Sequence, residues 1–290
     1  MQISLVGVGL MGAAMTERLL TLGHDVVVYN RTKAKCEALQ QQGAVLARSA
    51  VEAIQSSSCT ILMLSDATAI HDAVFAAGKP DFQNRTVIQM GTIAPSESLV
   101  LGRAIRSGLG DYFEAPVLGS IAEARTGRLV VMVGGQAEHV ARWNDVLTCF
   151  CHESVLVGPI GQAAALKLAL NQLLAAQMTA FSVSLGLILH SGIAVETFMT
   201  VLRHSSLMAS MFERKLPRML DHDYANPRFS TGNLLKDVRL SLDAAREAKV
   251  ATPSLDGIRD VFEHAVARDL GDLDYAAVFE AVAPQAGDHP

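Results

Sequence analysis

The chain has 290 residues, of which half are hydrophobic and 18% are charged, with a formal net charge of −5. At roughly 150 residues per domain, this length predicts two domains. The acidic balance argues against nucleic acid or an anionic membrane as the main partner, because both select basic surfaces. A mean hydropathy of +0.28 indicates apolar surface buried between domains or subunits, and it excludes the disordered and fibrous classes.

The first ten residues, MQISLVGVGL, contain no basic region followed by a cleavable apolar stretch, so we expect a cytoplasmic protein. The four cysteines lack the spacing of a disulfide scaffold, a zinc site or a redox pair. We expect them to be reduced packing residues. The nine histidines show no ligand spacing, and the sequence therefore predicts no metal site.

Short β-branched segments alternate with amphipathic helical patterns through the first half of the chain. This alternation is typical of βαβ units around a parallel sheet. We therefore predict an α/β domain over residues 1–160. Its predicted strands are 2–6, 26–30, 44–46, 59–64, 86–90, 112–115, 129–133 and 154–157, and its predicted helices include 11–22, 33–41 and 96–107.

The strand pattern stops after Gly161, and the remainder predicts helices throughout. We expect an all-helical domain over residues 161–290, with a terminal segment at 284–290 that frays. The predicted helices are 162–190, 194–203, 211–220, 232–248, 252–268 and 275–282.

The first of these helices contains an uncharged run from residue 168 to residue 195, which is long enough to span a bilayer. Polar residues recur through it, among them Asn171, Gln177 and His190, and no basic cluster flanks it. A helix that is apolar on most sides is also typical of the core of a large soluble protein. We expect a buried helix and no membrane partner.

Residues 3–12 read ISLVGVGLMG, in which a strand leads into a glycine-rich turn and then into a helix. Such a turn lets backbone N–H groups approach a pyrophosphate, and the helix N-terminus faces the anion with its positive dipole end. This context predicts dinucleotide binding. The cofactor-binding residues predicted in the turn are Gly7, Gly9, Leu10, Met11 and Gly12.

The second strand ends in Asn30-Arg31-Thr32, where an NAD-selective site usually has a carboxylate for the ribose 2′-hydroxyl. Asn30 carries no charge to repel a 2′-phosphate, and Arg31 and Thr32 are able to hydrogen-bond one. The sequence therefore favours NADP(H), with NAD(H) as the weaker alternative.

Five motifs follow one another along the chain: ISLVGVGLMG, MLSDATA, EAPVLGS, GQAAALKLALNQ and FSTGNLLKDV. As an ordered set they resemble the β-hydroxyacid dehydrogenase family, which includes 3-hydroxyisobutyrate dehydrogenases and glyoxylate/succinic semialdehyde reductases. The resemblance covers roughly residues 3–282. It implies an α/β Rossmann domain followed by an all-α domain that builds a homodimer or higher homo-oligomer, the two being joined by a long interdomain helix, with the active site in the cleft between them.

The resemblance places the family's catalytic lysine on Lys167 and its paired asparagine on Asn171. Their spacing supports the pair independently, because residues four apart on a helix share one face. Burial disfavours the charged form of an amine, so a lysine that opens a long uncharged run is suited to exchanging protons.

Further residues carry cofactor or substrate roles by the same resemblance. Lys236 matches the lysine that reaches the cofactor, and Phe229 falls in the substrate site. The loops beside the cofactor are matched by Leu64, Ser65 and Thr92. The family often has Ser-Thr where this chain has Gly91-Thr92, so one hydroxyl contact is absent.

The substrate loop departs from the family pattern, because Leu118 replaces the serine that usually hydrogen-bonds the substrate carboxylate. Gly119 and Ser120 still offer backbone N–H groups and a hydroxyl for an anion-binding nest. Either these groups hold the carboxylate, or the pocket takes a less polar substrate. The Gly-Ser pair, with MLSD and NRT, favours the glyoxylate/succinic semialdehyde reductase branch.

The sequence thus predicts NADPH-dependent reduction of a small carbonyl acid such as glyoxylate or succinic semialdehyde, with Lys167 as proton donor. One alternative is a 3-hydroxyisobutyrate-type dehydrogenase that works in the oxidative direction. Another is imine reduction, although imine reductases usually lack the lysine. A third is a non-catalytic NADP(H)-binding scaffold, which Leu118 keeps open.

Overall fold

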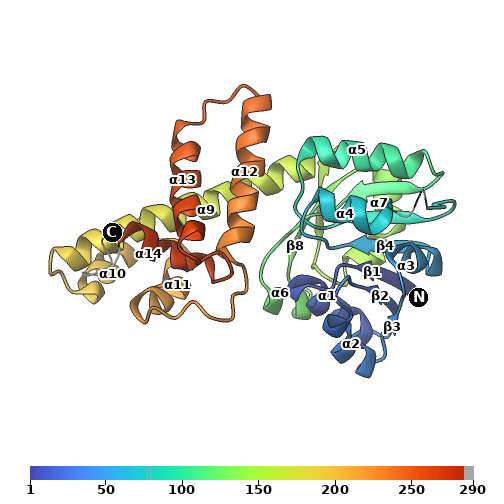
Figure 1. Ribbon diagram of the computed structural model, residues 1–290, viewed down its shortest axis with the longest axis horizontal. Coiled ribbons are helices and arrows are strands. Elements are labelled where there is room, and N and C mark those ends of the chain that lie inside the picture. The colour runs from blue at the N-terminus through green and yellow to red at the C-terminus, as the bar shows by residue number, and fades with distance from the viewer. Residues whose placement is uncertain (77, 79, 284–290) are drawn as a thin grey trace. The chain divides into compact units, whose positions relative to one another are not determined.

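The computed structural model describes residues 1–76, 78 and 80–283. The chain forms two compact units (Figure 1). The first unit comprises Met1–Leu168, and the second begins at Ala169. The segment 284–290, for which we predicted fraying, lies outside the described residues.

The first unit is an α/β domain in which strands and helices alternate from the N-terminus, coloured blue to green in Figure 1. Its strands are β1 (Gln2–Val6), β2 (Asp25–Tyr29), β3 (Val45–Leu46), β4 (Cys59–Leu62), β5 (Thr86–Gln89), β6 (Asp111–Glu114), β7 (Val117–Leu118), β8 (Val130–Gly134) and β9 (Ser154–Gly158). Its helices are α1 (Leu10–Thr21), the 3₁₀ turn η1 (Lys33–Cys36), α2 (Glu37–Gln41), α3 (Ala50–Ser56), α4 (Ala67–Val74), α5 (Pro95–Arg106), α6 (Ile121–Thr126), α7 (Ala137–Arg142) and α8 (Asn144–Leu147).

The sheet has the order β3-β2-β1-β4-β5-β6-β8-β7, and β9 pairs with β8. The six strands from β3 to β6 are parallel, whereas β8 runs antiparallel to β6. The order of the parallel strands reverses at β1 and β4, and such a reversal opens a ligand crevice at the carboxyl ends of the two strands. Both the predicted Rossmann fold and the place of its glycine-rich turn are confirmed.

Alternate side chains of the central strands enter two separate apolar clusters, as expected for a sheet covered on both faces. Along β1, for example, Ile3 and Leu5 pack in one cluster and Val6 in the other. The eight predicted strands are confirmed to within two residues at each end. The structure adds β7, which the sequence did not predict because it has only two residues and follows Pro116.

The second unit is all-helical and is built on α9 (Gln162–His190), whose first seven residues belong to the first unit. The predicted bounds of α9 are confirmed. The first compact unit ends at Leu168, whereas we predicted that the second domain begins at residue 161. The start of α9 belongs to the first unit because its first turn is hydrogen-bonded to β6. The other helices are α10 (Val195–Arg203), α11 (Ser210–Leu220), α12 (Thr231–Glu247), α13 (Pro253–Ala267), the 3₁₀ turn η2 (Tyr275–Ala277) and α14 (Val278–Val282).

Two segments predicted as single helices each begin with a 3₁₀ turn. Residues 33–41 divide into η1 and α2, and residues 275–282 divide into η2 and α14. In the second case the carboxylate of Asp274 accepts a hydrogen bond from the N–H of Ala276 and so tightens the first turn. Asp274 also forms a buried ion pair with Lys215, at 2.6 Å, next to the start of α12.

Helix α9 is long and apolar enough to cross a membrane, by length and composition alone, and 28% of its most apolar window is buried. We expected a buried helix, but within a single chain α9 is buried on one side only. One stripe faces the core of the helical unit, and it contains Ala175, Met178, Phe181 and Leu185. The opposite stripe exposes apolar side chains, among them Leu173, Val183 and Leu187.

Candidate active site

Three loops meet at the carboxyl edge of the parallel sheet with their backbones in contact. A Cβ built on Gly7, after β1, would lie 2.3 Å from the carbonyl oxygen of Met63, after β4. A Cβ on Gly91, after β5, would lie 2.5 Å from the carbonyl oxygen of Leu64. Glycine is therefore required at both positions in this chain, because the neighbouring loop lies too close for a side chain.

The N-terminus of α1 is open to a ligand. Its cap residue Gly9 provides no side-chain acceptor, and a Cβ built on it meets no atom within 4 Å. The first N–H groups of a helix have no intrahelical partner, and together with the helix dipole they favour an anion. Gly12 packs against the carbonyl oxygen of Gly7, which holds the helix close to the strand. These features fit a dinucleotide pyrophosphate, and exposed Leu10 and half-buried Met11 lie in the same turn.

Asn30 connects the glycine-rich turn to the end of β2. Its Oδ1 accepts the N–H of Val8 at 3.1 Å, and its Nδ2 donates to the carbonyl oxygen of Thr32 at 3.0 Å. The side chain thereby fixes the loop in which Arg31 and Thr32 are exposed. Two further cations that we did not single out from the sequence, Lys33 and Lys35, are exposed on η1 directly after them.

The loop after β4 has a fixed conformation at its exposed edge. Asp66 caps α4 by accepting the N–H of Ala69 at 2.7 Å, and the hydroxyl of Ser65 donates to the same carboxylate at 2.7 Å. Leu64 and, after β5, Thr92 are half-buried. The loops after β1, β2, β4 and β5 therefore carry the predicted cofactor-binding residues of the first unit.

The substrate loop follows the short strand β7, where Leu118 is half-buried and Gly119 adopts a positive φ of 141°. Both the backbone N–H and the hydroxyl of Ser120 donate hydrogen bonds to the carboxylate of Glu123, the N–H at 2.6 Å. Glu123 completes a capping box at the start of α6. The two donors of Ser120 that we expected to receive an anion are therefore engaged by a carboxylate of the chain itself.

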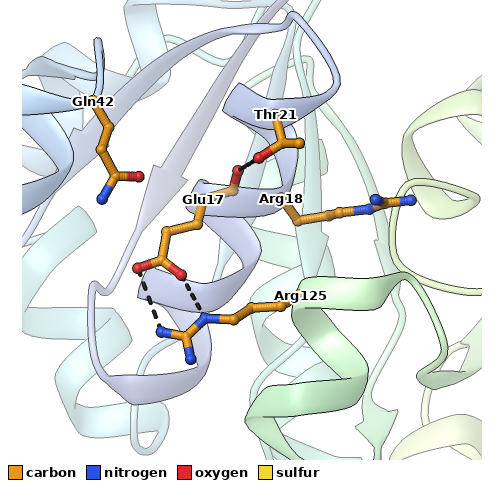
Figure 2. Close-up of a pocket in the computed structure, with 5 residues that line it drawn as sticks. All are labelled: Glu17, Arg18, Thr21, Gln42 and Arg125. Atoms are coloured by element: carbon orange, nitrogen blue, oxygen red, sulfur yellow. Dashed lines mark hydrogen bonds and ion pairs between the residues drawn. The ribbon is translucent and has the colours of Figure 1, made fainter.

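Helix α6 is held against α1 by an ion pair in which Arg125 Nε lies 2.6 Å from Glu17 Oε2 (Figure 2). The two residues line a pocket of about 270 Å³, with Arg18, Thr21 and Gln42. Arg18 extends away from this ion pair (Figure 2). Its Nε donates to the carbonyl oxygen of Cys149 at 3.0 Å. The contact fixes α6 and the substrate loop relative to the helix of the glycine-rich turn.

Lys167 and Asn171 both lie on the buried stripe of α9, with exposed fractions of 9% and 3%. In the second unit, Asn171 Nδ2 donates to Asp237 Oδ2 of α12 at 2.6 Å. The other oxygen of Asp237 lies 2.8 Å from the ammonium of Lys236, an ion pair that is not aligned as a hydrogen bond. Asp237 thus joins two predicted site residues. Asp237 is a site residue that we did not predict, although its place directly after Lys236 was a signal.

Phe229 is half-buried just before α12, and its ring makes an edge contact with Tyr275 at 6.1 Å between centroids. The predicted residues accordingly form one group at the edge of the sheet and another on α9 and α12. Among residues 1–76, 78 and 80–283 there is no group of three His, Cys, Asp or Glu side chains able to hold a metal ion. The cysteines are free and buried, and burial raises the pKa of the Cys59 thiol to about 12.

Two family models match the chain. One, described as the NAD binding domain of 6-phosphogluconate dehydrogenase, matches residues 2–158. The other, described as NAD-binding of NADP-dependent 3-hydroxyisobutyrate dehydrogenase, matches residues 161–282. The chain is also 33% identical to glyoxylate/succinic semialdehyde reductase 1 from Arabidopsis thaliana, over 97% of this chain and 98% of that protein.

Solved structures resemble it over nearly their full length. A 3-hydroxyisobutyrate dehydrogenase from Mycobacterium tuberculosis, solved with L-serine, is 25% identical with a TM-score of 0.84 and covers 98% of this chain and 99% of its own. An imine reductase from Pseudomonas sp. is 23% identical with a TM-score of 0.66, over 97% of this chain and 98% of its own. At that identity the second likeness shows the fold alone.

The fold and the matches define an NAD(P)-binding oxidoreductase that acts on CH–OH groups. The chain belongs to the β-hydroxyacid dehydrogenase family related to 6-phosphogluconate and 3-hydroxyisobutyrate dehydrogenases.

Removing the carboxylate of Asp237 should disturb both of its partners. We expect Asp237→Ala to lower the free energy of unfolding by about 3 kcal/mol, because it leaves the Asn171 amide buried without its acceptor and removes the attraction between Asp237 and Lys236. Urea denaturation followed by circular dichroism measures this change. The matched control is Asp243→Ala, which removes an exposed carboxylate from the same helix and should change stability by less than about 0.5 kcal/mol. Equal effects of the two substitutions would contradict a bridging role.

Proposed function

We propose that the protein is an NADPH-dependent reductase of a small carbonyl acid, such as glyoxylate or succinic semialdehyde. The observation that carries the proposal is the buried pair of Lys167 and Asn171 on one stripe of α9. A lysine and an amide in that setting fit proton transfer to a carbonyl oxygen rather than a packing role. The relative from Arabidopsis thaliana, which is named for both substrates, supports the choice of substrate class.

In this mechanism the Lys167 ammonium donates a proton to the oxygen of the substrate as the carbonyl is reduced to an alkoxide. When bound, the nicotinamide cofactor supplies the hydride. Asn171 orients the substrate or the lysine, and its own orientation is fixed by Asp237. General acid catalysis of this kind contributes typically ~10²–10⁴ in rate. Both side chains are largely shielded from water, which strengthens their electrostatic effect on the developing charge.

The preference for NADP(H) over NAD(H) is supported by the loop after β2. Asn30 stands where an NAD-selective site usually has a carboxylate for the ribose 2′-hydroxyl. Its amide hydrogen-bonds the backbone of the loop instead. Arg31, Lys33 and Lys35 are exposed there and supply positive charge for a 2′-phosphate. In the same proposal, Gly7, Gly9, Leu10, Met11 and Gly12 hold the pyrophosphate, Leu64, Ser65 and Thr92 lie beside the rest of the cofactor, and Lys236 reaches it from α12.

The substrate loop favours the smaller or less polar members of the substrate class. Glu123 engages the donors of Ser120, and Leu118 adds an apolar side chain where the family has a hydroxyl. A substrate carboxylate that approaches Ser120 has to displace Glu123 and also meets its negative charge. We therefore assign Leu118, Gly119, Ser120 and Phe229 to substrate binding, with Glu123 as an element that lowers affinity for carboxylates.

Three other functions compete with this proposal. A 3-hydroxyisobutyrate-type dehydrogenase would use the same residues in the oxidative direction. Imine reduction is supported only by a likeness of fold, and Lys167 argues against it. A non-catalytic NADP(H)-binding scaffold would have no use for the buried network of Asn171, Asp237 and Lys236.

We further propose a homodimer or higher homo-oligomer, assembled through the helical unit and located in the cytoplasm. The exposed apolar stripe of α9 supports this assembly. It borders a groove of about 630 Å³ that contains Val183, Leu187, Leu220 and Phe279. A second copy of the chain, related by a twofold axis, would cover this surface.

Replacement of the lysine tests the catalytic role. We expect Lys167→Ala to reduce kcat for glyoxylate or succinic semialdehyde by ~10²–10⁴, because the proton donor is lost, and to leave the NADPH dissociation constant within about twofold. Steady-state assays at 340 nm and a fluorescence titration with NADPH provide the two values. Near-normal turnover of the variant would show that another group donates the proton.

The role of Glu123 is tested by comparing two kinds of aldehyde. We expect Glu123→Gln to raise kcat/KM for carboxylate-bearing aldehydes by roughly threefold to tenfold, since one repelling charge is removed, and to leave kcat/KM for a neutral aldehyde of the same length unchanged. Glu138→Gln, on the exposed part of α7, serves as control. A parallel change for both aldehydes would contradict the proposed effect on substrate charge.

The assembly is tested with a charge on the apolar stripe. Light scattering of the purified protein should give at least twice the chain mass of 30.9 kDa, and Leu187→Glu should shift it towards the monomer because a buried charge opposes association. The exposed loop variant Leu109→Glu in the first unit should leave the mass unchanged. A wild-type monomer would overturn the proposed assembly.

A further inference from the structure

Helix α9 begins without any cap of its own. The N–H of Ala165 donates to the carbonyl oxygen of Gly161 at 3.0 Å, so Gly161 is the N-cap residue and Ala164 is the third residue of the helix. Neither has a side chain that accepts a hydrogen bond, although the first N–H groups of a helix need acceptors from outside it. A helix that starts in a buried position without such acceptors would lose stability in its first turn.

The missing acceptor comes from β6. The Oε1 atom of Glu114 accepts the N–H of Gly161 at 2.9 Å and the N–H of Ala164 at 3.0 Å. These are the two donors that a local capping box satisfies with two separate side chains. Here one carboxylate, contributed from 47 residues earlier in the chain, takes both places. Its negative charge also complements the positive end of the helix dipole.

Glu114 is itself held in one position. Its side chain is 1% exposed, and its second oxygen accepts a hydrogen bond from the hydroxyl of Ser98 on α5. That hydroxyl is in turn 2.8 Å from the hydroxyl of Tyr112. On the other side, a Cβ built on Gly134 would lie 2.5 Å from Oε1, so glycine on β8 leaves the room that the carboxylate occupies. Burial raises the pKa of the Glu114 carboxyl, and the hydrogen bonds from Ser98 and the α9 backbone oppose that rise.

We propose that Glu114 is a positioning residue for Lys167. By holding the first turn of α9 against the end of β6, it sets the place and direction of the turn on which Lys167 lies. Lys167 follows Ala164 by three residues, so a rotation or fraying of the first turn moves it directly. The catalytic consequence rests on the role proposed for Lys167, whereas the capping contact is independent of it.

The expected effect is on turnover, because a displacement of about 1 Å in a catalytic group costs about 10²-fold in rate. We expect Glu114→Ala to lower kcat roughly 10- to 100-fold and to leave KM and the dissociation constant for NADPH within about twofold. Glu114→Gln retains an acceptor oxygen and should restore most of the lost kcat. Glu114→Asp keeps the negative charge but moves the carboxylate away from the first turn of α9 by the length of one methylene group. We expect this variant to stay folded and to have an intermediate kcat.

A matched control exists on the neighbouring helix. Glu97 is also a helix-capping carboxylate of the first unit, because it accepts the N–H of Ala94 at the start of α5 at 2.7 Å. We expect Glu97→Ala to lower the thermal midpoint but to leave kcat within about twofold. Equal losses of kcat in Glu97→Ala and Glu114→Ala would show a general effect on stability and would overturn the proposal. If Glu114→Ala does not fold, full kcat in Glu114→Asp would overturn it as well.

Amide hydrogen exchange over residues 161–168 separates this proposal from the proposed function. Loss of the cap should speed exchange in that segment at least about 10-fold in Glu114→Asp, while the segment 95–106 keeps its wild-type rate. Unchanged exchange at 161–168 would overturn the positioning role, whatever the activity. A different result is faster exchange in Glu114→Asp combined with normal turnover in Lys167→Ala. That combination would support the capping contact and overturn the catalytic role of the lysine.

Discussion

The contact on which the site most depends is the one between the Glu114 carboxylate and the first turn of α9. Helix α9 carries Lys167 and Asn171, and it starts at a glycine that has nothing with which to cap it. The acceptor comes from the last residue of a central strand, so the helix begins where the sheet places it. The lysine therefore owes its position to the same parallel sheet that shapes the glycine-rich turn. A change in that sheet near β6 or β8 should therefore displace Lys167 through this carboxylate.

Other polar side chains of the chain also orient residues of the candidate site. Asp237 fixes Asn171 and neutralises Lys236, and Asn30 fixes the turn that exposes Arg31. In each case a buried or half-buried polar side chain is used to orient a residue assigned to substrate or cofactor. Glu123 differs, because it occupies the donors of Ser120 that the family resemblance assigns to the substrate. In the substrate loop, therefore, a carboxylate of the chain itself holds groups that were expected to bind the substrate.

Much of the fold follows from the sequence because its signals are local. Alternating β-branched runs, the glycine-rich turn and the uncharged run after Lys167 predict the Rossmann domain and the limits of α9 correctly. What the sequence could not supply comes from contacts between distant residues. Glu114 and Gly161 are 47 positions apart, and Gly91 is explained only by the carbonyl of Leu64 in another loop. The half-exposed state of α9 was missed because composition does not tell which side of an apolar helix meets the core.

The proposed reaction is the reduction of a small carbonyl acid with NADPH. The most direct measurement follows the oxidation of NADPH and of NADH at 340 nm with glyoxylate, succinic semialdehyde, methylmalonate semialdehyde and tartronate semialdehyde. We expect turnover of at least one of them, with kcat/KM for NADPH at least about tenfold above that for NADH, because Arg31 and its neighbouring lysines favour a 2′-phosphate. NADPH that binds but is not oxidised with any of the four would contradict the proposed function.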